Sequence, residues 1–462
     1  MALQLAESLC GLGCGLRRVS PARLATLPPQ IPPWTQRRGE VRPVKILFIV
    51  PYVPTLIRTR PFNLLRSLAQ RGHSLTLATL WEREAERAAL QALAGAGVQV
   101  LASRLGRRQI ARNTMVALAS NRPVQAVYAW QPELAGLLTS TIAGQRFDVV
   151  HVEHLRGAEY GLYIQAQLRR QGVSTPVVWD SVDCISLLFE QAARHSRSRF
   201  GRWVTRLELP RTRRYEAQAV QRFAGVLVTS PIDKAALEAL PRQPGATRQG
   251  SPLDDVRRPI FVLPNGVDTD YFSPAAAPAR SNQVILTGKM SYHANVTAAL
   301  HLVNDIMPHV WGRLPDVEVV IAGQAPPREI RALAERHPSR VAVTGFVADL
   351  RPHLRAAAVA AAPIAYGAGI QNKVLEAMAC GVPVVASPQA SSALQACPER
   401  DLLVADTPAG FAMAIVRLLE NPGLRLQLGA AGLRYVRLHH RWETITAQLE
   451  AFYEQCRESA FV

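Results

Sequence analysis

The chain has 462 residues, of which 48% are hydrophobic and 19% charged, a composition typical of a soluble globular protein with a substantial core. Its formal net charge is +18, but no block of basic residues is interleaved with aromatic side chains and no zinc-finger or RRM-like motif is present, so nucleic acid is not an expected partner. An anionic small molecule or an anionic membrane surface is compatible with this charge.

The N-terminal segment, residues 1–42, places an apolar stretch before a group of arginines, which is the reverse of the order in a signal peptide. We expect it to be a disordered leader. No apolar run approaches the roughly 20 residues needed to cross a bilayer. The cysteines are scattered without zinc-ligand spacing, which indicates a reduced, cytoplasmic protein without a metal site, in which Cys380 and Cys397 are core residues.

Residues 43–263 alternate short apolar runs with helical segments. The pattern predicts strands at residues 44–50, 74–80, 98–103, 147–154, 176–183, 225–230 and 260–266. Short, continuous apolar strands separated by helices are typical of a parallel sheet that is covered on both faces. We therefore expect a doubly wound N-terminal α/β domain.

Residues 264–280 begin with the turn Pro264–Asn265–Gly266 and continue into an Ala/Pro-rich stretch, which predicts an interdomain linker. The alternation resumes in residues 281–440, a second doubly wound domain. Strands are predicted there at residues 283–288, 317–323, 341–346, 358–365, 383–387 and 401–406. Asn295 is placed to cap the first helix of this domain. We expect helix breaks near Gly423 and Gly432, and a C-terminal helix over residues 441–462 that returns to the first domain.

Arginines crowd residues 194–214, just before a stripe formed by Tyr215, Ala219 and Phe223. The stripe has helical spacing and predicts core packing. The arginines form either a solvated helix face or a surface that holds an anionic membrane or an acceptor phosphate.

The stretch GAGIQNKVLEAMACGVPVVAS, residues 367–387, reads as a glycine loop, a helix and a strand. Gly367 and Gly369 permit close backbone approach to a ligand, and the N-terminus of the helix favours a diphosphate. Glu376, about one turn into the helix, can accept hydrogen bonds from the hydroxyls of a ribose. The alternative is that Glu376 only interacts with the helix dipole.

Four stretches carry a family resemblance. Residues 372–385 resemble the donor-site signature of glycosyltransferase family 4, and residues 264–268, 286–300 and 213–233 resemble its linker motif, its first donor-domain turn and the end of its first domain. More narrowly, the chain is similar to the sugar transferases of exopolysaccharide loci associated with the exosortase/PEP-CTERM system. The resemblance implies the GT-B fold, with two Rossmann-like domains facing across a cleft, a nucleotide-sugar donor in the second domain, and anomeric retention with no cofactor or required metal.

On this resemblance the expected donor-binding residues are Gly288, Lys289, Phe346, Gly367, Gly369, Ile370, Asn372, Lys373 and Glu376. Lys289 stands where the family usually has an arginine on the diphosphate, and Lys373 is the expected compensating cation. Asn295 replaces a second basic residue. Gly345 and Phe346 match a turn over the nucleobase. Ala368 departs from the family, which often has a glutamate there near the transferred sugar, so another group contacts the sugar or donor specificity differs.

In the first domain, Glu153 and His154 close a predicted strand and are the expected catalytic residues that hold the acceptor. The alternative is an ordinary hydrogen-bonded pair. Arg60, which comes just before a predicted helix, and Arg58 can meet an acceptor phosphate or else lie on the surface. Asp180 and Asp183 close the next strand.

The resemblance predicts a retaining glycosyltransferase that moves a sugar from a nucleotide-diphosphate donor to a saccharide or lipid-linked saccharide acceptor in cell-surface polysaccharide synthesis, at the inner face of the membrane. Two alternatives stay open. A nucleotide-sugar epimerase of the same fold would act without an acceptor, and a non-catalytic nucleotide-sugar-binding protein would explain Ala368.

Overall fold

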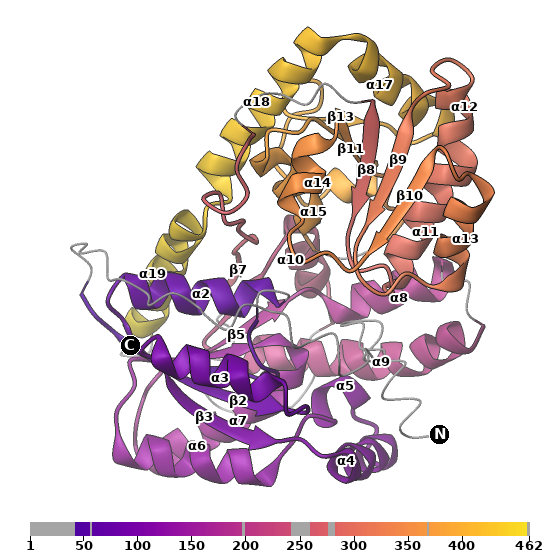
Figure 1. Ribbon diagram of the computed structural model, residues 1–462. Helices are drawn as coiled ribbons and strands as arrows, with labels where there is room; N and C mark the ends of the chain where they lie inside the picture. Colours follow the sequence, from indigo (N-terminus) through magenta and orange to yellow (C-terminus); the bar gives the residue numbers. More distant parts are fainter. Residues whose placement is uncertain are drawn as a thin grey trace. The chain divides into compact units, whose positions relative to one another are not determined.

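The computed structural model describes residues 42–55, 58–195, 199–241, 259–275, 282–366 and 369–459. These residues form two compact units, each described here by itself (Figure 1). The first unit runs to Leu263 and includes the chain from Thr446 onward, whereas the second covers Pro264–Ile445. The expected leader, apart from Arg42, lies outside the described residues, as do Gly367 and Ala368.

A seven-stranded parallel sheet forms the centre of the first unit, in the order β3-β2-β1-β4-β5-β6-β7. The strands are β1 (Lys45–Val50), β2 (Ser74–Trp81), β3 (Gln99–Arg104), β4 (Val149–Glu153), β5 (Val177–Val182), β6 (Gly225–Val228) and β7 (Ile260–Val262). All residues of β4 and β6 are buried, as expected for strands covered on both faces. Chain order reverses between β1 and β4, so the carboxyl ends of these two strands mark the usual ligand position in such sheets.

Helices surround the sheet of the first unit, and α7 packs against β1, β4 and β5. They are α2 (Thr59–Gln70), α3 (Glu86–Gly95), α4 (Arg107–Ala119), α5 (Val124–Val127), α6 (Pro132–Gly144), α7 (His154–Arg170), α8 (Ile185–His195), α9 (Arg199–Arg222), α10 (Pro231–Glu238) and α19 (Trp442–Glu458). The predicted stripe on α9 is confirmed as core, because Tyr215, Ala219 and Phe223 are buried.

The C-terminal helix α19 completes the first unit. Phe452 packs so closely that a Cβ atom on Gly225 of β6 would lie 2.6 Å from its ring. The carboxylate of Glu450 accepts two hydrogen bonds from Arg71, from Nε over 2.5 Å and from Nη2 over 2.6 Å. Its Oε1 also lies 2.7 Å from His73 Nε2. These contacts hold α19 against segments that are distant in sequence.

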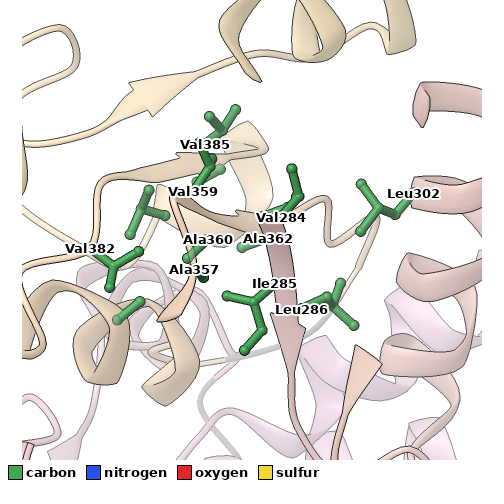
Figure 2. Close-up of a cluster of buried hydrophobic side chains, with 14 of the residues drawn as sticks. Val284, Ile285, Leu286, Leu302, Ala357, Val359, Ala360, Ala362, Val382 and Val385 are labelled. Atoms are coloured by element: carbon green, nitrogen blue, oxygen red, sulfur yellow. The ribbon is translucent and has the colours of Figure 1, made fainter. Parts of the chain in front are cut away.

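The second unit contains a six-stranded parallel sheet in the order β10-β9-β8-β11-β12-β13. The strands are β8 (Gln283–Thr287), β9 (Glu318–Ala322), β10 (Val341–Gly345), β11 (Val359–Ala362), β12 (Val384–Ala386) and β13 (Leu403–Val404). Aliphatic side chains of β8, β11 and β12 form the core shown in Figure 2. Here the order reverses between β8 and β11, which are paired.

The sheet of the second unit is covered by α11 (His293–His301), α12 (Met307–Trp311), α13 (Arg328–Arg336), α14 (Arg351–Ala356), α15 (Asn372–Ala379), α16 (Pro388–Ser391), α17 (Pro408–Glu420) and α18 (Pro422–His439), with the π-helical turn η2 (Leu302–Ile306) between α11 and α12. No helix among the described residues is both long and apolar enough to cross a lipid bilayer.

Two expectations from the sequence are wrong. Gly432 does not break a helix: it lies within α18, where a Cβ atom would come 3.1 Å from Met378 of α15, so its lack of a side chain permits close helix packing. The break expected near Gly423 is confirmed, and it lies at Asn421, whose side chain caps α18. Cys397 is exposed rather than part of the core, whereas Cys380 is buried as predicted.

Candidate functional site

The helix α15 begins where the sequence predicts a donor site. Gly369, at φ 68°, and the buried Ile370 precede it, and Asn372 is its first residue. Asn265 Nδ2 donates to Asn372 Oδ1 over 3.3 Å, which ties the helix start to the segment that follows β7. The unpaired N–H groups of a first helical turn attract anions. The start of α15 is therefore an anion-favouring position at the carboxyl edge of the sheet.

The far end of α15 is fixed by a glycine cap. Gly381 has a φ of 72° and its N–H donates to Met378, while the N–H of Val382 donates to Ala377. This pair of bonds is a Schellman motif, which favours glycine because a side chain is strained at positive φ. The cap stops the helix after two turns and starts the chain toward β12.

Lys373 is the centre of a polar cluster with the turn after β8. Its Nζ donates to Asn295 Oδ1 over 2.6 Å and to Gln371 Oε1 over 3.3 Å. Asn295 Nδ2 in turn donates to the carbonyl oxygen of Lys289 over 2.9 Å. The prediction that Asn295 caps α11 is therefore wrong: the helix begins at His293, and Asn295 positions Lys373 and the turn instead.

Gly288 makes this close approach possible. It has a φ of 143°, and a Cβ atom there would lie 2.8 Å from Asn295 Nδ2 and 3.4 Å from Lys373 Cε. A side chain at this position would displace the amide of Asn295, the partner of Lys373. The structure thus brings together Gly288, Asn295, Lys373 and the backbone of Lys289, which come from three segments of the second unit.

Burial shifts the titration of the two charged groups on α15. Burial lowers the pKa of Lys373 to about 8, an effect that the nearby Glu376 opposes. Burial raises the pKa of Glu376 to about 7, which Lys373 opposes in turn. Both groups are half-buried and titrate close to neutrality, so each can respond to an incoming charge.

The other described residues predicted to bind the donor are not part of the cluster around Lys373. Phe346 follows β10 and is 44% exposed. Gly367 lies outside the described residues, as does Ala368. The roles assigned to all the predicted donor residues stay predictions.

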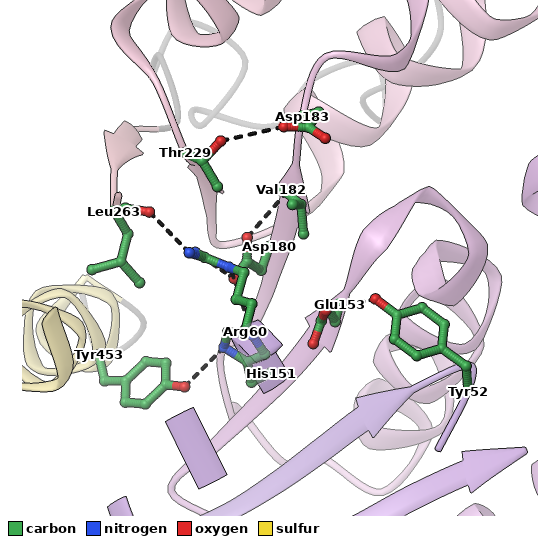
Figure 3. A network of polar contacts seen from close by, with 10 residues as sticks. All are labelled: Tyr52, Arg60, His151, Glu153, Asp180, Val182, Asp183, Thr229, Leu263 and Tyr453. Carbon is green, nitrogen blue, oxygen red and sulfur yellow. Dashed lines mark hydrogen bonds and ion pairs between the residues drawn. The ribbon is translucent and has the colours of Figure 1, made fainter. Parts of the chain in front are cut away.

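In the first unit, Glu153 closes β4 beside the point where strand order reverses (Figure 3). The hydroxyl of Tyr52, just after β1, donates to Glu153 Oε1 over 2.7 Å, while the buried Oε2 has no hydrogen-bond partner within the described ranges. Burial raises the pKa of Glu153 to about 8, and the carboxylate of Asp180 adds to the rise. At neutral pH the carboxyl group is therefore mostly protonated, and its O–H can donate a hydrogen bond.

His154 is the first residue of α7 and has a φ of 64°. Its Nδ1 accepts a hydrogen bond from the N–H of Arg156 over 3.3 Å. Burial, helped by the charge of Arg156, lowers the pKa of His154 to about 3. The imidazole is therefore neutral, so it acts as a hydrogen-bonding group and not as a cation.

Arg60 is buried and paired within the first unit. Its Nε donates to Asp180 Oδ2 over 2.8 Å, and its Nη1 donates to the carbonyl oxygen of Leu263 over 3.1 Å (Figure 3). Asp180 also lies 3.6 Å from Nε2 of His151, whose Nδ1 is 2.8 Å from the hydroxyl of Tyr453. This network joins α2, β4, β5 and α19, and it gives Arg60 a structural role that the sequence did not predict. Its phosphate role stays a prediction.

The sequence reasoning missed three polar side chains near the predicted sites. The hydroxyl of Tyr52 donates to Glu153, and His293, which follows the turn after β8, has its Nδ1 2.8 Å from the hydroxyl of Tyr366. Each follows a predicted strand, so the rule that ligands bind at carboxyl ends of parallel strands could have found them. Within the described ranges, no group of three or more His, Cys, Asp or Glu residues is placed to hold a metal ion.

These two parallel-sheet units define the class: the fold is that of the GT-B glycosyltransferases. Sucrose-phosphate synthase from Thermosynechococcus elongatus matches over 90% of this chain and 100% of its own, with 17% identity and a TM-score of 0.62. HepE from Anabaena, solved in complex with UDP and glucose, matches over 89% of this chain and 100% of its own, with 14% identity and a TM-score of 0.61.

More particularly, residues 281–421 match the family model of glycosyl transferases group 1. A phosphatidyl-myo-inositol mannosyltransferase from Mycobacterium tuberculosis is 31% identical over 204 residues, which is 42% of this chain and 53% of that protein. The chain thus spans about half the length of the curated relatives it matches.

Proposed function

We propose that the chain is a retaining glycosyltransferase that moves a sugar from a nucleoside-diphosphate donor to a saccharide or lipid-linked saccharide acceptor. The family match of the second unit supports the transferase class, and the relative in M. tuberculosis is named a phosphatidyl-myo-inositol mannosyltransferase. A role in exopolysaccharide synthesis, as in the exosortase-associated transferases, belongs to the same proposal.

The cluster around Lys373 is the observation that carries the proposal. The Nζ atom of Lys373 donates a hydrogen bond to the amide oxygen of Asn295 over 2.6 Å, and a diphosphate oxygen is a stronger partner for the same cation. The N-terminus of α15 adds backbone N–H donors to the same position. In this proposal Glu376, one turn further on, accepts hydrogen bonds from the ribose hydroxyls.

The chemistry follows from where charge develops. As the bond between the sugar and the diphosphate breaks, negative charge accumulates on the departing phosphate, and Lys373, Lys289 and the helix terminus stabilise it. The acceptor hydroxyl forms the new bond, and its proton passes to the leaving phosphate. In this proposal the donor is a co-substrate, and no metal or other cofactor takes part.

We assign acceptor binding to the first unit. Glu153, with its unpartnered Oε2, and the neutral His154 would hold an acceptor hydroxyl by hydrogen bonds, and Tyr52 fixes the carboxyl group. Because the pKa of Glu153 is raised to about 8, the group would donate a hydrogen bond at neutral pH instead of removing a proton.

A lipid-linked acceptor would place the protein at a membrane, and α9 offers a suitable face. Trp203 is 57% exposed and Leu207 37%, and the exposed Arg206 and Arg213 lie on the same helix. Apolar side chains flanked by arginines favour an anionic lipid surface. We expect the double variant Trp203→Ser/Leu207→Ser to sediment less with vesicles containing phosphatidylglycerol than the unchanged chain does.

Turnover with a panel of UDP-, GDP- and ADP-sugars and lipid-linked saccharide acceptors tests the function. The expected result is a product whose anomeric configuration matches that of the donor, formed only when acceptor is present. Conversion of the donor sugar without acceptor would instead indicate an epimerase. Tight nucleotide-sugar binding with no transfer would indicate a non-catalytic binding protein.

A further inference from the structure

A pair of aromatic side chains spans the point where strand order reverses in the second unit. His293 starts α11, directly after the turn that follows β8, and Tyr366 follows β11. His293 Nδ1 lies 2.8 Å from the hydroxyl of Tyr366, and the rings stack with centroids 5.2 Å apart and an interplanar angle of 14°. The carboxyl ends of strands on either side of such a reversal are where ligands bind in open parallel sheets.

One atom of this pair and one atom two residues before His293 lack hydrogen-bond partners among the described residues. His293 Nε2 and the hydroxyl oxygen of Ser291 are both buried and have no hydrogen-bond partner in the part of the chain that the structure describes. Burying an unsatisfied polar atom is costly, so a native structure that keeps two of them in one turn requires a reason. A ligand with polar oxygens that enters this position would satisfy both atoms.

The chemistry of these atoms indicates the kind of ligand group. Burial lowers the pKa of His293 to about 4, so the imidazole offers no positive charge at neutral pH. Since Tyr366 occupies Nδ1, the outer nitrogen Nε2 is left as one directed donor or acceptor. A sugar hydroxyl, which can both donate and accept, suits a neutral imidazole and a serine hydroxyl. A diphosphate, which only accepts, suits the cation of Lys373.

We infer that His293, oriented by Tyr366 and assisted by Ser291, binds a hydroxyl group of the sugar that the donor carries, and so determines which donor sugars are accepted. This inference rests on the proposed function. His293 and Ser291 act on the donor sugar, whereas Lys373 acts on the diphosphate. Tyr366 is a positioning residue, because it acts through the imidazole.

The test compares nucleotide sugars with bare nucleotides by isothermal titration calorimetry, using UDP-glucose against UDP and GDP-mannose against GDP. His293→Phe should weaken the nucleotide sugar that binds best by roughly 5- to 20-fold, the loss of one or two hydrogen bonds, and leave the bare nucleotide unchanged. Tyr366→Phe and Ser291→Ala should act in the same direction with smaller effects. His293→Gln, which keeps an amide near the position of Nε2, should restore part of the loss.

His301→Phe is the matched control, because His301 lies on the same helix, is partly exposed and pairs with Asp305. His301→Phe should change neither the affinity for the nucleotide sugar nor the affinity for the bare nucleotide. If His293→Phe weakens bare nucleotide and nucleotide sugar equally, or weakens neither, the inference is wrong while the proposed function stands. If the unchanged chain binds none of the nucleotides, the proposed function itself fails first.

Discussion

Lys373 and Glu376 lie one turn apart on α15, and each has a pKa that burial moves toward neutrality. A cation with a pKa of about 8 is charged in most molecules at neutral pH but loses its proton in mildly alkaline solution. The strength of diphosphate binding should therefore depend on pH within an accessible range.

We expect the affinity for a bare nucleoside diphosphate to fall as the pH rises through about 8, because Lys373 becomes neutral there. The Lys373→Arg variant should remove this decline, since a guanidinium stays protonated to a pKa above roughly 12. Titration calorimetry between about pH 6.5 and about pH 9.5, which extends roughly 1.5 pH units to either side of the transition, would measure this decline in affinity. Parallel declines in both proteins would show that another group is responsible.

Glu153 makes the stability of the first unit depend on pH. Its pKa is about 8 in the folded chain and near the ordinary value of 4.5 in the unfolded chain, so between these values the folded state binds more protons. The free energy of unfolding therefore falls as the pH rises across this window.

Replacing Glu153 with Gln keeps the acceptor for the Tyr52 hydroxyl and removes the titrating group. From pH 5 to 8 the unchanged chain should lose up to roughly 1.4 kcal/mol per pH unit relative to Glu153→Gln, as measured by urea unfolding. A constant difference between the two proteins across this range would mean that Glu153 is ionised at neutral pH.

At the scale of single residues, positions at the ends of strands and helices could be predicted from sequence, but contacts between distant residues could not. Lys373, Glu376 and Glu153 could be proposed as site residues because each stands at the end of a predicted strand or the start of a predicted helix. The capping role given to Asn295 failed because its partner, Lys373, is 78 residues away in sequence. Arg60 likewise pairs with Asp180, 120 residues away, which no local pattern reveals.

Among the secondary-structure elements, α18 supports α15 by packing on its C-terminal cap. A Cβ atom on Gly429 of α18 would lie 2.2 Å from the carbonyl oxygen of Gly381, which is far inside contact distance. The backbone at Gly381 is held by the cap of α15 and cannot easily retreat.

Gly429→Ala should therefore destabilise the protein by about 1–3 kcal/mol, the usual cost of overpacking, and should weaken donor binding because α15 must shift. Gly136→Ala on α6 is the matched control: this helical glycine is exposed, and a Cβ atom there meets nothing within 4 Å. The control should raise the free energy of unfolding by roughly 0.5–1 kcal/mol. Equal effects of the two changes in urea unfolding would rule out the packing argument.

The strands could be predicted from sequence almost completely, because a strand buried on both faces is a short apolar run and needs no long-range information. Every predicted run overlaps one of the observed strands β1 to β13. The ends of helices were harder to predict from the sequence. The break expected at Gly432 failed because this glycine serves the packing of α18 on Met378, which depends on the tertiary fold.

For the molecule as a whole, α19 is the element on which the first unit depends. Its residues Leu449, Phe452, Tyr453 and Cys456 are almost fully buried, and Tyr453 reaches the buried network around Asp180. Although α19 is last in sequence, it therefore contributes to the core of the unit that begins the chain.

Deleting residues from Thr446 onward should destabilise the first unit and leave the second folded. Hydrogen exchange followed by mass spectrometry should show lost protection in β1, β4 and β6, with β8 to β12 unchanged. Glu454→Ala, at a position of α19 where the side chain is 60% exposed, should leave the exchange pattern as it was. Full protection of the first unit after the deletion would contradict this role of α19.

The most direct measurement is the affinity of UDP, GDP and ADP for the unchanged chain and for Lys373→Met, with Lys234→Met, an exposed lysine on α10, as the matched control. We expect at least one nucleotide to bind, Lys373→Met to weaken it by at least roughly 10-fold, and Lys234→Met to have no effect. If no nucleotide binds, or if Lys373→Met binds as tightly as the unchanged chain, then α15 is not the donor-diphosphate site.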